Sequence, residues 1–390
     1  MSQQFRTNLV SKFVCVAENC PDTCCKHWSM QVDLETAEKY KAQIPELFSA
    51  IEADISGDYI MRKDALTTCC VKFENGRCGI QQKYGEEMLG DACALYPRIT
   101  RKIGDAIIMT ATMSCPEVAR IALYGEQPFA FADAEIKRVP QEVKNVLPDE
   151  ISVADAMAIH AAFINATEDK FVSAEQVLLR IYSAAKSLEF IAKKDWVNAA
   201  PMYLRLADGR IPKAEKNIND PFNLLHALCG LIVASKKNAP PRLAQTIAEI
   251  ETALNAKLDW QNVAITTYND SLEKYNNLQE IWNKKAPKIY EPIFKNWLAE
   301  QMSAAFFPFA GLGKNLAERI TIIGVRMAIF RLAMMSVYGT HGRVLHQDDV
   351  VRVAQSLSRF LEHLANPDFF LQICAETGWS KESRMGGLLA

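Results

Sequence analysis

The chain has 390 residues, of which 49% are hydrophobic and 23% charged, and its 44 basic residues nearly balance 46 acidic ones. These fractions exclude a disordered or fibrous protein and leave enough apolar residues for two or three domains. A net charge of −2 gives no bulk attraction to nucleic acid or to an anionic membrane, so we expect neither as a partner.

The cysteines are distributed unevenly, because nine of the 11 lie in residues 1–115. Such a local density is typical of a disulfide scaffold or of a metal-binding domain. The first residues lack the apolar core and cleavage site of a signal peptide, which favours a reducing cytoplasm, and therefore metal over disulfides. The sequence predicts a cytoplasmic protein with a cysteine-rich metal-binding region.

Short elements are predicted through this cysteine-rich region. Asp33 can cap a helix over 33–44. An Asn-Gly pair predicts a hairpin over 71–78, since both turn residues need positive φ, and a second hairpin is expected over 99–112. A proline in the first turn begins a helix over 115–125.

Longer helices follow in the second part of the chain. Ser173 and Gln176 fit a capping box, and apolar residues recur at helical spacing over 350–364. We therefore expect a mainly α protein, in which a small cysteine-rich α+β domain with short hairpins at 1–125 packs on a larger all-helical domain at 126–390.

The apolar stretch over 320–339 is long enough to cross a membrane. It contains Arg326 and Arg331, each of which would cost about 3 kcal/mol at the centre of a bilayer. A buried core helix is the better interpretation, and no membrane association is expected.

The cysteine spacing is irregular and includes two adjacent pairs. Four thiolates around one centre suit zinc or an iron–sulfur cluster. The two Cys-x2-Cys knuckles that are usual in a structural zinc site are missing, so the spacing fits a cluster better than a zinc ribbon. His27, within this region, could be a ligand or an ordinary packing residue. Spacing alone does not identify the four ligands.

Several motifs resemble the flagellin lysine-N-methylase family. They are the cysteine-rich run Phe13–Trp28, then Tyr96-Pro97-Arg98 and Ser114–Val118. Near the C-terminus, the helix around Arg326 and the residues Asp348–Val350 and Gln355–Arg359 also resemble the family, whereas the middle of the chain matches only in being helical.

The resemblance implies an enzyme that methylates lysine ε-amines of flagellin with S-adenosylmethionine and carries a [4Fe-4S] cluster. Wider relatives with this motif are known as zinc- or iron-chelating domains, so zinc stays an alternative. Cys70 stands where the family pattern usually has proline and is left out. The resemblance makes eight cysteines metal-ligand candidates, namely Cys15, Cys20, Cys24, Cys25, Cys69, Cys78, Cys93 and Cys115.

The sequence itself adds little independent support for methyl transfer. The glycine-rich turn at 311–314 follows no clear strand and reads as an interhelical turn rather than a cofactor loop. The radical form of this chemistry uses Cys-x3-Cys-x2-Cys. Cys20 and Cys24 match the first two positions of that motif, but the third falls on His27. Arg98 could bind a carboxylate or phosphate of a cofactor, or form a structural ion pair. No catalytic residue can be named, and a non-catalytic metal scaffold or a redox protein remains the competing hypothesis.

Overall fold

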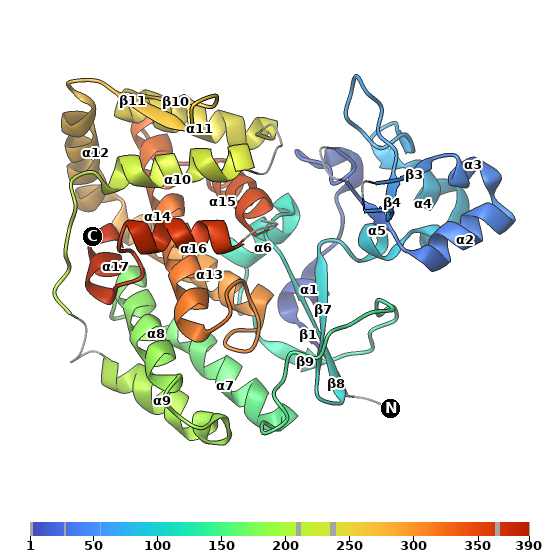
Figure 1. Cartoon of the computed structure of the whole chain (residues 1–390), viewed down its shortest axis with the longest axis horizontal. Helices are drawn as coiled ribbons and strands as arrows, with labels where there is room; N and C mark the ends of the chain where they lie inside the picture. Colours follow the sequence, from blue (N-terminus) through green and yellow to red (C-terminus); the bar gives the residue numbers. More distant parts are fainter. Residues whose placement is uncertain are drawn as a thin grey trace.

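The computed structural model describes residues 3–26, 29–54, 56–207, 212–234, 239–362 and 367–389. Figure 1 shows a large helical body, a small lobe built from the early part of the chain, and a sheet beside both. The protein is mainly helical, as predicted, but the part at 126–390 is not all-helical, because its described residues contain three short strands, Phe131–Asp133, Ala256–Asp259 and Ala264–Thr267.

The small lobe has a hydrophobic core of its own, built from residues between Met30 and Ala94. The predicted helix over 33–44 is confirmed, because Asp33 Oδ1 accepts a hydrogen bond from Thr36 N at 2.8 Å. The hairpin predicted over 71–78 is also present. The lobe contains β2 (Gln31–Val32), α2 (Leu34–Gln43), α3 (Pro45–Phe48), β3 (Ile51–Ala53), β4 (Tyr59–Met61), β5 (Phe73–Glu74), β6 (Arg77–Cys78), α4 (Gly79–Tyr84) and α5 (Asp91–Leu95).

A four-stranded sheet in the order β7-β8-β1-β9 joins the N-terminal residues to the rest of the chain. The predicted hairpin over 99–112 forms its β7 and β8, and β1 pairs with β8 in parallel. Neither β1 nor β9 was expected from the sequence. The elements of this part are β1 (Gln4–Thr7), α1 (Asn8–Lys12), β7 (Arg98–Ile103), β8 (Ala106–Ala111), α6 (Pro116–Tyr124) and β9 (Phe131–Asp133).

The sheet and α6 share the hydrophobic core of the helical body rather than that of the lobe. Helix α6 packs against two body helices, α13 (Pro287–Ala305) and α15 (Gln347–Leu361). The two apolar cores therefore do not meet at residue 125. The division of the chain into domains at 1–125 and 126–390 stays a prediction.

The helical body surrounds α14 (Leu316–His341), which contains the apolar stretch discussed above. Its most apolar window is long enough to span a membrane but is entirely buried within the protein. The capping box of Ser173 and Gln176 is confirmed. The remaining elements are α7 (Val153–Ala166), α8 (Ala174–Leu188), α9 (Trp196–Leu206), α10 (Asp220–Ala234), α11 (Pro241–Leu254), β10 (Ala256–Asp259), β11 (Ala264–Thr267), α12 (Ser271–Lys285), α16 (Pro367–Glu376) and α17 (Glu382–Leu389).

Candidate functional site

A cavity of about 580 Å³ lies where the lobe meets the sheet, and we call it the thiol cavity. Seven of the eight predicted cysteines line it. Cys69 is not among its lining residues, and its neighbour Cys70, which the family pattern left out, lines it instead. All 11 cysteines, each within the described part of the chain, are free thiols. The cysteines that line the cavity are Cys15, Cys20, Cys24, Cys25, Cys70, Cys78, Cys93 and Cys115.

Local structure directs several of these thiols into the cavity. Cys78 precedes α4 and Cys115 precedes α6, so both stand at the amino ends of helices. Helix-terminal N–H groups and the positive end of the helix dipole favour a thiolate there. Cys70 N donates to the Cys25 carbonyl at 2.7 Å, which holds these two cysteines together, and Lys72 N lies 3.4 Å from Cys70 Sγ.

Four of the thiols act on one another electrostatically. Burial raises the pKa of the Cys93 thiol, and the thiolates of its neighbours Cys78, Cys25 and Cys70 raise it further. Burial likewise raises the pKa of Cys70 to about 11, with Cys25, Cys78 and Cys69 adding to the shift. Desolvated thiols that crowd together without a cation stay protonated, whereas a bound metal reverses this preference.

A second set of thiols lies nearer to α6. Burial raises the pKa of Cys115 to about 12, and Cys20 and Cys15 add to the shift. No three or more His, Cys, Asp or Glu side chains among the described residues are arranged to hold a metal ion, so binding would have to draw thiols together. His27, named above as a possible ligand, lies outside the described residues.

Tyr96, Pro97 and Arg98 form a wall between the thiol cavity and a second cavity of about 510 Å³, since these residues line both. The Tyr96 hydroxyl accepts a hydrogen bond from Ser114 Oγ at 3.2 Å. The Arg98 guanidinium lies 5.2 Å from the centre of the Phe13 ring. Arg98 therefore lines both cavities, and its binding of a cofactor stays a prediction. We call the second cavity the Thr112 cavity, because Thr112 lines it.

Helix α15 holds residues 20–26, which we call the cysteine loop, through a buried polar contact. Arg359 forms an ion pair with Asp22, and Arg359 Nη2 donates to the Lys26 carbonyl at 2.6 Å. Gln355 Nε2 donates to Asp22 Oδ2 at 2.8 Å and to the Ser114 carbonyl at 3.0 Å. The C-terminal residues that carried the resemblance thus contact the cysteine-rich segment, a connection that no local sequence signal indicated.

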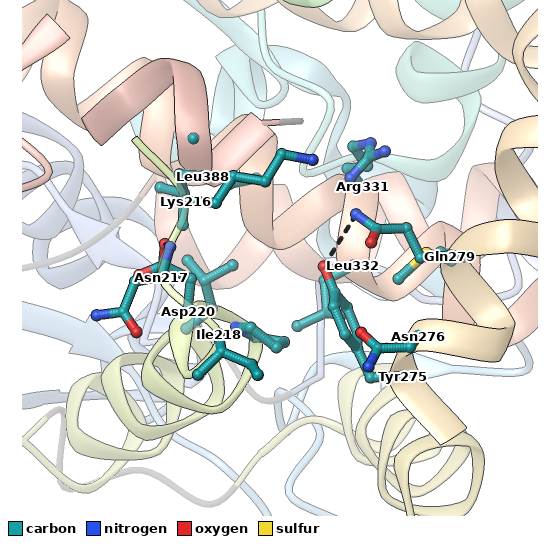
Figure 2. Close-up of a pocket in the computed structure, with 15 residues that line it drawn as sticks. Lys216, Asn217, Ile218, Asp220, Tyr275, Asn276, Gln279, Arg331, Leu332 and Leu388 are labelled. Carbon is teal, nitrogen blue, oxygen red and sulfur yellow. Dashed lines mark hydrogen bonds between the residues drawn. The ribbon is translucent and has the colours of Figure 1, made fainter. Parts of the chain in front are cut away.

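Another cavity, of about 330 Å³, lies wholly in the helical body among α10, α12, α14 and α17. Figure 2 shows Gln279 beside Tyr275, with its Nε2 3.4 Å from the Tyr275 hydroxyl, and Arg331 near the same opening. No cysteine lines this cavity. Its lining therefore lacks the ligand chemistry of the thiol cavity.

The fold and the site together define a mainly α protein with a thiol-lined cavity between a small lobe and a sheet. Residues 150–386 match the family described as "FliB lysine N-methylase C-terminal domain". This chain belongs to that family.

Curated relatives cover a smaller part of the chain. The Lysine-N-methylase of Salmonella typhimurium is 28% identical over 148 residues, which are 36% of this chain and 36% of that protein. The Lysine-N-methylase of Salmonella choleraesuis shows the same identity and coverage. The Flagellar biosynthetic protein FliU of Salmonella muenchen is 27% identical over 139 residues, 33% of this chain and 80% of that protein. The chain thus spans about a third of the two Lysine-N-methylases that it matches, and no solved structure matches it.

Proposed function

We propose that this protein is a cytoplasmic protein-lysine N-methyltransferase that transfers a methyl group from S-adenosylmethionine to flagellin lysines. Family membership carries the proposal, and it is supported by two relatives named Lysine-N-methylase and a third with a flagellar name. The near-neutral net charge argues against steering by bulk electrostatics, so flagellin would be recognised through local contacts.

We also propose that the thiol cavity holds a [4Fe-4S] cluster. The donor set fits, because thiolates are the usual ligands of iron–sulfur clusters. Of the mutually close thiols in the cavity, Cys70 and Cys93 together with Cys25 or Cys78 would hold three irons of the cluster, which leaves the fourth iron without a thiolate ligand. When bound, the cluster would supply an iron with an open position for the amino and carboxylate groups of the methyl donor, with zinc as the alternative metal. Arg98, on the cavity wall, is a candidate for the donor carboxylate.

The target lysine must lose a proton before it can react. Its unperturbed pKa is about 10.4, so only about one amine in a thousand is neutral and nucleophilic at pH 7.4. The Thr112 cavity suits the lysine side chain, because Met30, Ile60 and Leu95 offer apolar walls for the methylenes. The donor and the lysine would thus lie on either side of Tyr96, and an in-line attack would require the amine to reach past this shared wall into the thiol cavity.

The test combines metal analysis with methylation of purified flagellin. Anaerobically purified protein should be brown and should contain iron and acid-labile sulfide. It should methylate flagellin lysines with or without dithionite, and mass spectrometry should detect each transferred methyl group as a mass increase of ~14 Da. Cys93→Ser should lose colour and activity, whereas Cys374→Ser, at a buried cysteine of α16, should keep both.

Three results would contradict parts of this account. A colourless protein with stoichiometric zinc would refute the cluster. Strict dependence on dithionite with release of 5′-deoxyadenosine would refute polar transfer. A pure, metal-loaded protein that leaves flagellin unmodified would favour a metal scaffold or redox protein.

A further inference from the structure

Two carboxyl groups lie together beneath the loop that carries Cys115. Glu300 of α13 is fully buried, and Glu362 directly follows α15. Gln301 Nε2 donates to both acids, at 2.9 Å from Glu300 Oε2 and 2.6 Å from Glu362 Oε1. Because one amide nitrogen contacts both groups, the two carboxyls are close neighbours.

The loop above the pair connects it to both cavities. Met113 N donates to Glu300 Oε1 at 2.8 Å, and the Thr112 hydroxyl donates to Glu362 Oε2. Thr112 also lines the Thr112 cavity, and Cys115, at the end of the same loop, lines the thiol cavity. Glu362 is therefore one hydrogen bond behind the wall of the Thr112 cavity.

The charges of the pair set where its proton resides. Burial and the negative charge of Glu362 hold the pKa of Glu300 well above its usual range. Arg326 of α14 is the cation of this network, since its Nη1 lies 3.3 Å from Gln301 Oε1 and its Nη2 donates to the Leu361 carbonyl. One guanidinium balances one negative charge, so the buried pair holds one proton between its two carboxyl groups, and burial favours that proton on Glu300.

We propose that Glu362, supported by Glu300, accepts the proton of the substrate lysine through the Thr112 hydroxyl. This inference rests on the proposed lysine methylation. The lysine ammonium gives a proton to Thr112 Oγ as the Thr112 hydroxyl gives its own to Glu362. The neutral amine then attacks the sulfonium methyl, its lone pair forms the N–C bond, and the C–S electron pair stays on sulfur. The products are a methylammonium, a neutral thioether and a protonated Glu362.

The pair suits this role for two physical reasons. A negative carboxylate near the end of the Thr112 cavity attracts the ammonium that must be deprotonated, and a second carboxyl group that already holds a proton keeps only one charge in a buried place. General bases of this kind typically contribute about 10²-fold to 10⁴-fold to the rate.

The test compares Glu362→Gln with wild type in single-turnover methylation of flagellin at pH 7.5 and pH 9.5. We expect the variant to be slower by about 10²-fold or more at pH 7.5. Most of this loss should disappear at pH 9.5, because the neutral fraction of a free lysine amine rises about 100-fold over that interval. S-adenosylmethionine affinity and iron content should match wild type. Thr112→Val, which keeps the shape of the side chain, should show a smaller loss with the same recovery.

Glu251→Gln is the matched control, since Glu251 is a half-buried carboxylate of α11 that accepts from Leu258 N at 2.7 Å, away from both cavities. It should keep the wild-type rate at both pH values. Two results would overturn this inference and leave the proposed function standing. One is a wild-type rate in Glu362→Gln, and the other is a loss of rate that stays constant between the two pH values in both Glu362→Gln and Thr112→Val. A wild-type protein that neither binds the donor nor methylates flagellin would instead refute the proposed function.

Discussion

Replacing Arg359 by methionine should loosen the cysteine loop, because it removes one member of a buried ion pair. The side chains of Arg359 and Asp22 are only 3% and 9% exposed. Arg359→Met leaves the Asp22 carboxylate with the Gln355 hydrogen bond and also removes the bond from Arg359 Nη2 to the Lys26 carbonyl. Breaking a buried pair in this way costs about 3–5 kcal/mol.

The lower end of that range is appropriate here, because Gln355 still contacts the stranded carboxylate. A loss of about 3 kcal/mol corresponds to a roughly 150-fold increase in the equilibrium constant for local opening. Hydrogen exchange measured by mass spectrometry should therefore speed up by about two orders of magnitude in peptides covering residues 20–26. Adding Asp22→Asn to Arg359→Met removes the unpaired charge and should recover part of the loss.

Arg77→Met is the control, because it removes the exposed ion pair between Arg77 and Glu18 in the same part of the protein. Exposed pairs of this kind contribute little to stability, so exchange over residues 20–26 should stay at the wild-type rate. If the exchange rate over residues 20–26 is unchanged in Arg359→Met, or rises equally in Arg77→Met, then α15 does not fix the cysteine loop.

Three further predictions concern the cavity, the pH dependence of stability and the core. Cys70→Ser should lower the iron content of the purified protein while Cys69→Ser leaves it unchanged, since of these two cysteines only Cys70 lines the thiol cavity. The reverse result would support the family pattern instead. Burial lowers the pKa of His160 from 6.5 to about 4, so the unfolded chain takes up a proton that the folded protein does not. The free energy of unfolding should accordingly fall by about 3 kcal/mol as pH drops from 6.5 to 4, and a urea titration at each pH should show less of this fall in His160→Phe. Gly324→Ala should lower the melting temperature more than Gly339→Ala, because a Cβ at 324 would lie 2.6 Å from Sδ and 2.8 Å from Cε of the fully buried Met385, whereas at the exposed position 339 it would displace only the terminal methyl of Leu278. Equal melting temperatures would contradict this packing argument.

Local signals in the sequence predicted local structure well. The side chain of Asp33 and the capping box of Ser173 place helix starts correctly, and the Asn-Gly turn places the short hairpin ending at Cys78. These features depend on hydrogen bonds or dihedral angles within a few residues. Strand β1 was missed because its partners, β8 and β9, lie about 100 residues away and its own four residues carry no strand periodicity.

Of the residues that line the candidate site, the sequence pointed only to the cysteines and to Arg98. The type and density of the cysteines indicated a soft-metal site, and seven of the eight candidates do line one cavity. Spacing could not show which of the adjacent residues Cys69 and Cys70 lines the cavity. Neighbouring side chains in an extended segment point in different directions, and the backbone pairing that orients them is determined only by the fold. The contact of Arg359 with Asp22 and the pairing of Glu300 with Glu362 join segments far apart in sequence, so no motif could reveal them.

If the thiol cavity holds a metal centre, binding of the methyl donor should depend on that metal. Isothermal titration of S-adenosylmethionine into anaerobically purified protein, before and after removal of its iron by a chelator, measures this dependence. We predict one binding site per chain in the iron-loaded protein, loss of binding after chelation, and recovery after reconstitution with iron and sulfide. Equal affinity for the donor with and without iron would contradict the claim.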